Sequence, residues 1–482
     1  MIRSGIFSFR YLKLGLIGIL VACGAFDGSF LRGSPAAALQ RAVPAQTQAI
    51  PPLSANDVSW LFPVPTRAED FAKLIAVRDL TTQSPQDPTK RGLVWPYEVF
   101  LQFLTIAASP AAQVAGKQIG LPAEAQVMDA WFIAGIRIDA GAPGLSNDIR
   151  AQFGQLPEIR LIVQPVTRKP DGTPQVQDIA VHLIFDFKLK NPNDSTPPDC
   201  LVRSMPDLDT FNAIVADLAA LRTKLSDGQF GAHKVTTSGV PLGVHPGLAD
   251  ATTALNLREE MKSFLEKYIS GQRLDAMAIA GLPAGKPAPW IFLAMLNLHP
   301  GDLPALPNGG LVPVPGPTLD GQQFAQMLEP SGTSFQVVPE PHTNNLNPIT
   351  CKNAAKSAAS LPIASRIGDA TTEVFVNPAL PTDKTKEILD VIADPNKSHF
   401  FNTDCVSCHT ETRLARDILK ITNVPGIDPA ALPKDSWNVR NFGWSPAGGW
   451  QATVTRRTAA ETAAVVTFIN SGLLAKKAAP SR

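Results

Sequence analysis

The sequence lacks an excess of charge of either sign, and it has few aromatic residues. Lys and Arg number 43 and Asp and Glu 42 among 482 residues, so the net charge is +1 with histidine neutral. Aromatic residues make up 7% of the chain, and no basic stripe accompanies them. The chain therefore has no global electrostatic attraction to nucleic acid or to another polyanion, and we expect no nucleic-acid partner.

Repeats and common catalytic signatures are also missing. No internal repeat of fixed period is visible, and neither a GxSxG nucleophile motif nor an HExxH zinc motif occurs. The first absence argues against a repeat architecture. The second leaves a serine hydrolase or a zinc protease of these types without support in the sequence.

The N-terminus has an apolar run that is too short to span a bilayer. Leu14–Ala22 contains nine apolar or glycine residues and follows three basic residues. A membrane-spanning helix needs about 20 such residues. The pattern is typical of a signal peptide, which we predict over residues 1–22, and the alternative is a buried core helix.

Two cleavage sites compete behind this run. Leu20 to Cys23 reads Leu-Val-Ala-Cys and resembles a bacterial lipobox, in which Cys23 carries the lipid and becomes the mature N-terminus. The alternative is cleavage after the Ala-Ala-Ala at 36–38. The first interpretation predicts a lipoprotein anchored in the periplasm or cell envelope, with residues 23–55, rich in Ala, Pro, Gly and Ser, as its tether.

Mixed secondary structure follows the tether. Apolar residues alternate at 159–163 and again at 181–187, which predicts a β-hairpin with a long loop. Helical spacing predicts helices over 208–225 and 257–268. Proline, at 44 residues, is abundant and concentrates with Gly and Asn over 301–350. We therefore predict an α+β region over 56–350.

The segment after residue 350 is predicted to be helical. A short helix is expected from Thr382 to Ala393, and a second is expected to run from Ser398 into Cys405. Thr458 and Glu461 have the spacing of a capping box, so a last helix is expected to begin there and to end before Gly472.

Residues 405–409 read Cys-Val-Ser-Cys-His, a CxxCH motif. Two thiols at this spacing add to the two vinyl groups of a haem, and the histidine that follows is held beneath the iron as its proximal ligand. A zinc site would need two more ligands at close spacing, and a thioredoxin-like pair would need a βαβ setting. The motif therefore predicts one covalent haem c on Cys405 and Cys408, with His409 on the iron.

Because it contains this motif, the segment 399–482 resembles a compact mono-haem cytochrome c domain. Phe401 lies four residues before Cys405, where that family has an aromatic residue on its first helix, and the last helix corresponds to the family's C-terminal helix. The resemblance implies a small all-α domain, which we place at 351–482. Residues 56–350 resemble no family that we can name.

The sequence departs from that family at the sixth iron ligand. No Met and no His follows His409. The ligand must then come from upstream or from solvent, or the site is open. His399 is nearest but needs a bend in the chain, His342 lies in a loop-like Pro-Glu-Pro-His run, and another upstream Met or His is a further alternative.

The remaining cysteines and the residues near the motif allow two interpretations each. Cys200 and Cys351 are predicted to form a disulfide, the alternative being two buried thiols. A group of aromatic residues either lines the haem pocket or forms an ordinary core, and a group of arginines either pairs with haem propionates or is solvated. The aromatic group consists of Trp437, Phe442, Trp444 and Trp450. The arginine group consists of Arg440, Arg456 and Arg457.

We therefore expect an exported cytochrome that transfers electrons to a redox partner protein. The alternatives are a peroxidase-like haem enzyme and a haem-based sensor, because an iron with an open sixth position binds small ligands. Whether the chain is an enzyme stays open at this point, with an electron carrier or an electron-transfer subunit favoured.

Overall fold

The computed structural model describes residues 52–83, 89–109, 113–114, 117–118, 121–142, 156–190, 204–281, 291–302, 308–313, 325–331, 334–338, 381–398, 405–434, 440–446 and 449–474. By its contacts the chain divides into two units, Met1–Gln48 and Ala49–Arg482, and every described residue belongs to the second. The predicted signal peptide and Cys23 lie outside the described residues. Within the described residues, no helix is both long and apolar enough to cross a membrane.

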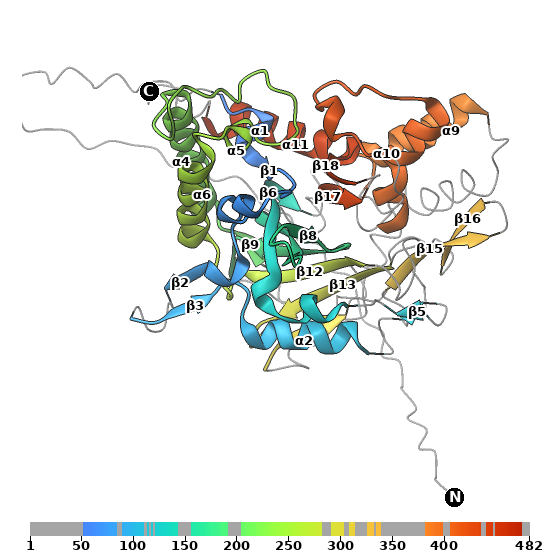
Figure 1. Cartoon of the computed structure of the whole chain (residues 1–482), viewed down its shortest axis with the longest axis horizontal. Helices are drawn as coiled ribbons and strands as arrows, with labels where there is room; N and C mark the ends of the chain where they lie inside the picture. The colour runs from blue at the N-terminus through green and yellow to red at the C-terminus, as the bar shows by residue number, and fades with distance from the viewer. Residues whose placement is uncertain are drawn as a thin grey trace, which may run out of the picture. The chain divides into compact units, whose positions relative to one another are not determined.

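The centre of this unit is a ten-stranded sheet, and every strand pair recorded in it is antiparallel (Figure 1). Eight strands form its main path, in the order β1-β6-β7-β9-β12-β13-β15-β16, while β8 pairs with β7 and β14 with β13. The strands are β1 (Ser59–Leu61), β6 (Trp131–Ala142), β7 (Leu156–Arg168), β8 (Pro174–Val176), β9 (Ile179–Asp186), β12 (Leu274–Gly281), β13 (Ile291–Leu298), β14 (Gly310–Pro313), β15 (Ala325–Ser331) and β16 (Ser334–Val338).

The predicted hairpin is confirmed. Strands β7 and β9 pair antiparallel with Leu161 opposite Leu183, and the connection between them contributes the short strand β8. Alternating apolar residues produced this strand pair because successive side chains of a strand point to opposite faces. The α+β class expected for the region before residue 350 is confirmed as well.

The two faces of the sheet differ in composition and burial. One face carries large apolar side chains that are at most 3% exposed. These are Ile159, Leu161, Val163, Val181, Leu183, Met277, Ile279, Leu293 and Met295. The opposite face, which we call the alanine face, carries Ala180, Ala276, Ala278, Ala280 and Ala294 on three adjacent strands. The same face also carries larger side chains, namely Ile162, Ile184, Phe292 and Leu296, so it mixes small and large residues, whereas the first face is uniformly large and apolar.

Both helices predicted before residue 300 are present. Helix α4 spans Leu208–Ser226, and Asp207 caps its N-terminus by accepting a hydrogen bond from the Thr210 amide. Helix α6 spans Ala254–Tyr268 and lies beside α4, where Lys224 and Glu260 form an ion pair (Figure 1). A further helix, α2 (Tyr97–Ala107), packs Phe100 and Phe103 against the indoles of Trp95 and Trp131.

The region after residue 380 was predicted to be all-α, and in this respect the prediction was wrong. Helices α9 (Thr382–Ala393), α10 (Cys405–Leu419) and α11 (Arg456–Phe468) are present, and α9 has the predicted bounds. Between α10 and α11, however, β17 (Phe442–Pro446) and β18 (Trp450–Val454) form an antiparallel hairpin. The signal was available, because Gly448 and Gly449 separate two segments that alternate large and small residues.

The β17–β18 hairpin is built into the core of the larger unit. The Trp444 amide donates to Gln164 Oε1 at 2.7 Å, and Gln164 Nε2 donates back to the Trp444 carbonyl at 2.9 Å. The Trp444 indole donates to the Phe62 carbonyl at 2.9 Å. A Cβ on Gly135 of β6 would come within 2.7 Å of the Phe442 ring, so glycine is needed for this close approach. The predicted domain boundary at 350 lies outside the described residues and stays a prediction.

The start of α11 differs from the predicted capping box. Thr455, not Thr458, is the N-cap, and its side-chain oxygen accepts a hydrogen bond from the Thr458 amide at 3.3 Å. Glu461 pairs with arginines and so does not complete a box with Thr458. The helix continues into a turn of π-helix over Ile469–Leu474, and it therefore runs past Gly472.

Candidate functional site

The CxxCH segment forms the start of α10. The described part of this helix begins at Cys405, so position 408 follows position 405 by three residues, about one helical turn. Cys408 and His409 are both half-buried, whereas Thr410 is fully buried. The buried Thr410 therefore anchors the first turn of α10, and Cys408 and His409 lie at the edge of the packed interior.

His409 lies against the alanine face of the sheet. Its imidazole makes an edge-to-face contact with the ring of Phe292 on β13, with ring centroids 4.5 Å apart. Phe292 pairs with Ala280 on the neighbouring strand β12, and paired residues point to the same face. Side chains two residues apart on a strand also share a face. The histidine of the CxxCH segment therefore faces the side of the sheet that carries the small residues.

A second histidine, His182 on β9, belongs to the same face. His182 pairs with Ala278 of β12, and Ala278 pairs in turn with Ala294 of β13. All three side chains are half-buried, although they lie in the middle of a ten-stranded sheet. The two alanines therefore place small side chains next to His182, on the face that carries the Phe292 ring in contact with His409.

The two histidines are close enough to interact electrostatically. Burial, followed by the charges of His409 and Arg160, holds the pKa of His182 well below its usual range. A neutral imidazole keeps a nitrogen lone pair, which is the form that binds metal ions. Sequence reasoning did not select His182. The available signal was a histidine at a polar position of an otherwise apolar, alternating strand.

The arginines near the motif are buried or half-buried and paired, so the alternative that they are solvated was wrong. Arg440 is 1% exposed and donates to Asp178 at 2.7 Å. Arg457 and Arg137 both bind Glu461, each at 2.7 Å. Arg456 is half-buried and bonds Asp390 and the buried Glu411. Their placement reflects tertiary packing, which the local sequence does not encode.

Glu461 is the centre of this network. Burial alone raises the pKa of a carboxyl group, but the charges of Arg457 and Arg137 outweigh it and hold the pKa of Glu461 far below its usual range. Arg457 also interacts with the Cys408 thiol. The ion-pair network therefore connects α11 and β6 with the start of α10.

Glu461→Gln is expected to lower the free energy of unfolding by about 3 kcal/mol, because it leaves two buried guanidinium groups without their shared countercharge. Chemical denaturation of the variant and the wild type measures the difference. The matched control is Glu387→Gln, since Glu387 is 66% exposed and, among the described residues, pairs with Lys384 alone. We expect the control to change stability by less than about 1 kcal/mol. Equal effects of the two variants would contradict a buried network.

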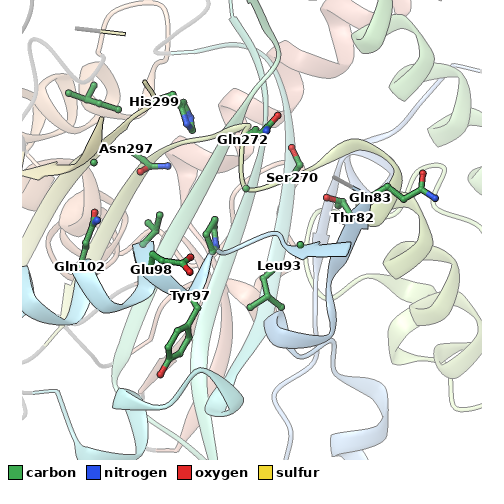
Figure 2. A pocket seen from close by; sticks show the side chains of 16 residues that line it. Thr82, Gln83, Leu93, Tyr97, Glu98, Gln102, Ser270, Gln272, Asn297 and His299 are labelled. Atoms are coloured by element: carbon green, nitrogen blue, oxygen red, sulfur yellow. The ribbon is translucent and has the colours of Figure 1, made fainter. Parts of the chain in front are cut away.

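A cavity lies elsewhere on the unit, beside α2 (Figure 2). Its volume is about 550 Å³, and its polar lining includes Glu98 from α2, Ser270 and Gln272 before β12, and Asn297 at the end of β13. Asn297 Nδ2 donates to the Leu274 carbonyl at 2.6 Å and so supports the backbone. The polar groups of this lining do not assemble a nucleophile with a base, and the cavity does not include the CxxCH segment.

A group of possible metal ligands borders this cavity. Single ligand atoms of Asp275, His299 and Asp302 all lie within 4.8 Å of one another. Lys188, however, already forms an ion pair with Asp275, and its ammonium group supplies the positive charge that a cation would bring. We call this group the charge cluster; Lys188 balances Asp275, and the buried Nε2 atom of His299 has no hydrogen-bond partner among the described residues.

The other predicted site residues lie outside the described part of the chain. This applies to His399 and His342 as sixth ligands, to Cys200 and Cys351 as a disulfide, and to the lipidation site Cys23. The structure neither brings them together nor separates them. Among the aromatic residues, Phe442 and Trp444 belong to the shared core, Trp450 packs against that core while partly buried, and Trp437 is outside the described residues.

Comparison with known proteins provides no family for this chain. No family model matches it, and neither the curated proteins nor the solved structures contain a match.

Proposed function

We propose that this chain is an exported c-type cytochrome that transfers electrons through one haem, attached to Cys405 and Cys408 with His409 as the proximal ligand. The observation that carries the proposal is the CxxCH segment at the start of α10, with its histidine turned toward a sheet face of small residues. When bound, the haem supplies a one-electron couple at its iron.

The residues present fit such a group. The motif offers two thiols and an imidazole, which is the donor set of a c-type attachment. Beside it, the alanine face carries the small, half-buried side chains of Ala278 and Ala294. The chain's own contribution is to hold His409 against Phe292 and to surround the site with paired arginines such as Arg440 and Arg457.

Electron transfer is favoured over the two alternatives, a peroxidase-like enzyme and a haem-based sensor. Both alternatives need an open sixth position on the iron. His182, a histidine on the sheet face that carries the Phe292 ring in contact with His409, supports a filled position. The partner would then be a redox protein rather than a small oxidant.

The proposal is tested by haem staining of the denatured, purified full chain together with its intact mass. The expected result is a stained band whose mass exceeds that of the polypeptide by one haem. Loss of all haem on denaturation would contradict covalent attachment.

A lipid anchor at Cys23 is part of the proposal. Leu-Val-Ala-Cys at 20–23, followed by a Pro-rich segment, supports it, and two or more acyl chains would provide stable membrane association. Membrane fractions should contain the wild type, and Cys23→Ala should shift it to the soluble fraction. A mature N-terminus at Leu39 without lipid would instead show cleavage at the Ala-Ala-Ala site.

A further inference from the structure

We propose that His182 is the sixth ligand of the iron, so that the haem is held between His409 of α10 and His182 of β9. The inference rests on the proposed function, since it assumes a haem on the CxxCH segment. The ligand on the distal side of that haem would then come from the central sheet, which lies in the region before residue 350.

The first argument is the placement of the two histidines. His409 contacts Phe292 on β13, and His182 belongs to the same face two strands away, on β9. Adjacent strands are about 4.8 Å apart, so two spacings separate these backbones by about 10 Å. Metal–imidazole bonds are about 2 Å long, so an ion bound by both imidazoles would lie above β12, between His182 and the Phe292 ring that contacts His409.

The second argument is the composition of the space around His182. The strand between the two histidines carries Ala276, Ala278 and Ala280 on this face, and Ala294 follows on β13. His182, Ala276, Ala278 and Ala294 are half-buried at the centre of the sheet, whereas the far-face residues between them are fully buried. A flat macrocycle can approach small side chains such as these more closely than large ones.

The third argument is that His182 has no competing role. It forms no hydrogen bond with any described residue, whereas His245 accepts one from the Gly247 amide at 3.2 Å and His233 pairs with Asp250 at 2.7 Å. His299 lies just beyond the end of β13, next to Asp275 and Asp302.

The methionines of the central strands point away from the site. Met277 and Met295 belong to the opposite face of the sheet and are each 1% exposed. Among the described histidines and these methionines, His182 alone shares a face with the ring that contacts His409.

The test uses the purified full chain with His182→Ala and His182→Met, and His233→Ala as the matched control. The oxidised wild type and the control should be low-spin, with the near-infrared and paramagnetic resonance signature of two imidazoles, and should not bind carbon monoxide rapidly when reduced. His182→Ala should become high-spin and bind carbon monoxide, and added imidazole should restore the low-spin spectrum. His182→Met should raise the reduction potential, because a thioether ligand favours the reduced iron.

Several results would overturn the assignment. These are a His182→Ala spectrum identical to that of the wild type, a high-spin wild type, or loss of the two-imidazole signature in His342→Ala or His399→Ala. If the His182 variants do not fold, the wild-type signature and the two other histidine variants still decide. Covalent haem in a wild type that lacks the signature would overturn this inference alone, whereas a wild type without covalent haem would overturn the proposed function as well.

Discussion

Cys408→Ala is expected to lower covalent haem content at least about tenfold, because a single thiol cannot fix the haem edge at two points. The haem content is measured per polypeptide by denaturing-gel haem stain and by the absorbance of the alkaline pyridine complex. Cys405→Ala should have the same effect, since the two thiols act as a pair.

The control for these variants is Ser407→Ala, which changes an intervening position and leaves the CxxCH spacing intact. It should retain wild-type haem content. Unfolding of the Cys408→Ala apoprotein should be followed as well, because Cys408 interacts with Arg457 and a folding defect must be separated from a loading defect. Cys408→Ala with wild-type covalent haem would remove the chemical basis of the proposed function.

Trp444→Ala is expected to lower the free energy of unfolding by about 5 kcal/mol. Truncating a buried tryptophan costs about 3–5 kcal/mol, and the buried Phe62 carbonyl, which accepts from the indole at 2.9 Å, would lose its partner at a further cost of about 1–3 kcal/mol. Denaturant titrations of variant and wild type, monitored by far-ultraviolet circular dichroism and by haem absorbance, measure the loss.

The shape of the transition tests how the chain is organised. Because Trp444 and Gln164 exchange two hydrogen bonds, the hairpin and the central sheet should unfold together, and both probes should shift by the same amount. Tyr97→Ala is the control, since Tyr97 is 52% exposed and should change stability by less than about 1 kcal/mol. A shift confined to the haem signal would show that the C-terminal part unfolds as an independent domain. If Trp444→Ala does not fold, Trp444→Phe provides a milder version of the same comparison.

Local patterns in the sequence predicted much of the secondary structure. The alternation around Leu161 and Leu183 predicted the β7–β9 hairpin, and helical spacing predicted α4, α6 and α9 close to their observed bounds. These elements follow from side-chain periodicity, which depends only on neighbours along the chain. Thr455 shows the limit of this reasoning, because two threonines three residues apart offered alternative caps and the wrong one was chosen.

The candidate site also has one part that the sequence predicted and one part that it did not. The motif at 405–409 was recognisable because its chemistry requires residues that are adjacent in sequence. The partners of that motif were not recognisable, because Phe292 and His182 precede His409 by more than a hundred residues. Their proximity depends on strand register and on the packing of α10 against the sheet.

The sequence by itself thus predicted the class of most elements and the proposed attachment chemistry at Cys405, Cys408 and His409, because both follow from short-range spacing. Only the tertiary structure decided that the hairpin carrying Trp444 joins the central sheet and that Glu461 pairs with arginines from two elements. It also decided that His182 shares a face with the ring that contacts His409. The physical reason is that sheet register and core packing bring together residues far apart in the chain, and no local pattern records which of many apolar surfaces will meet.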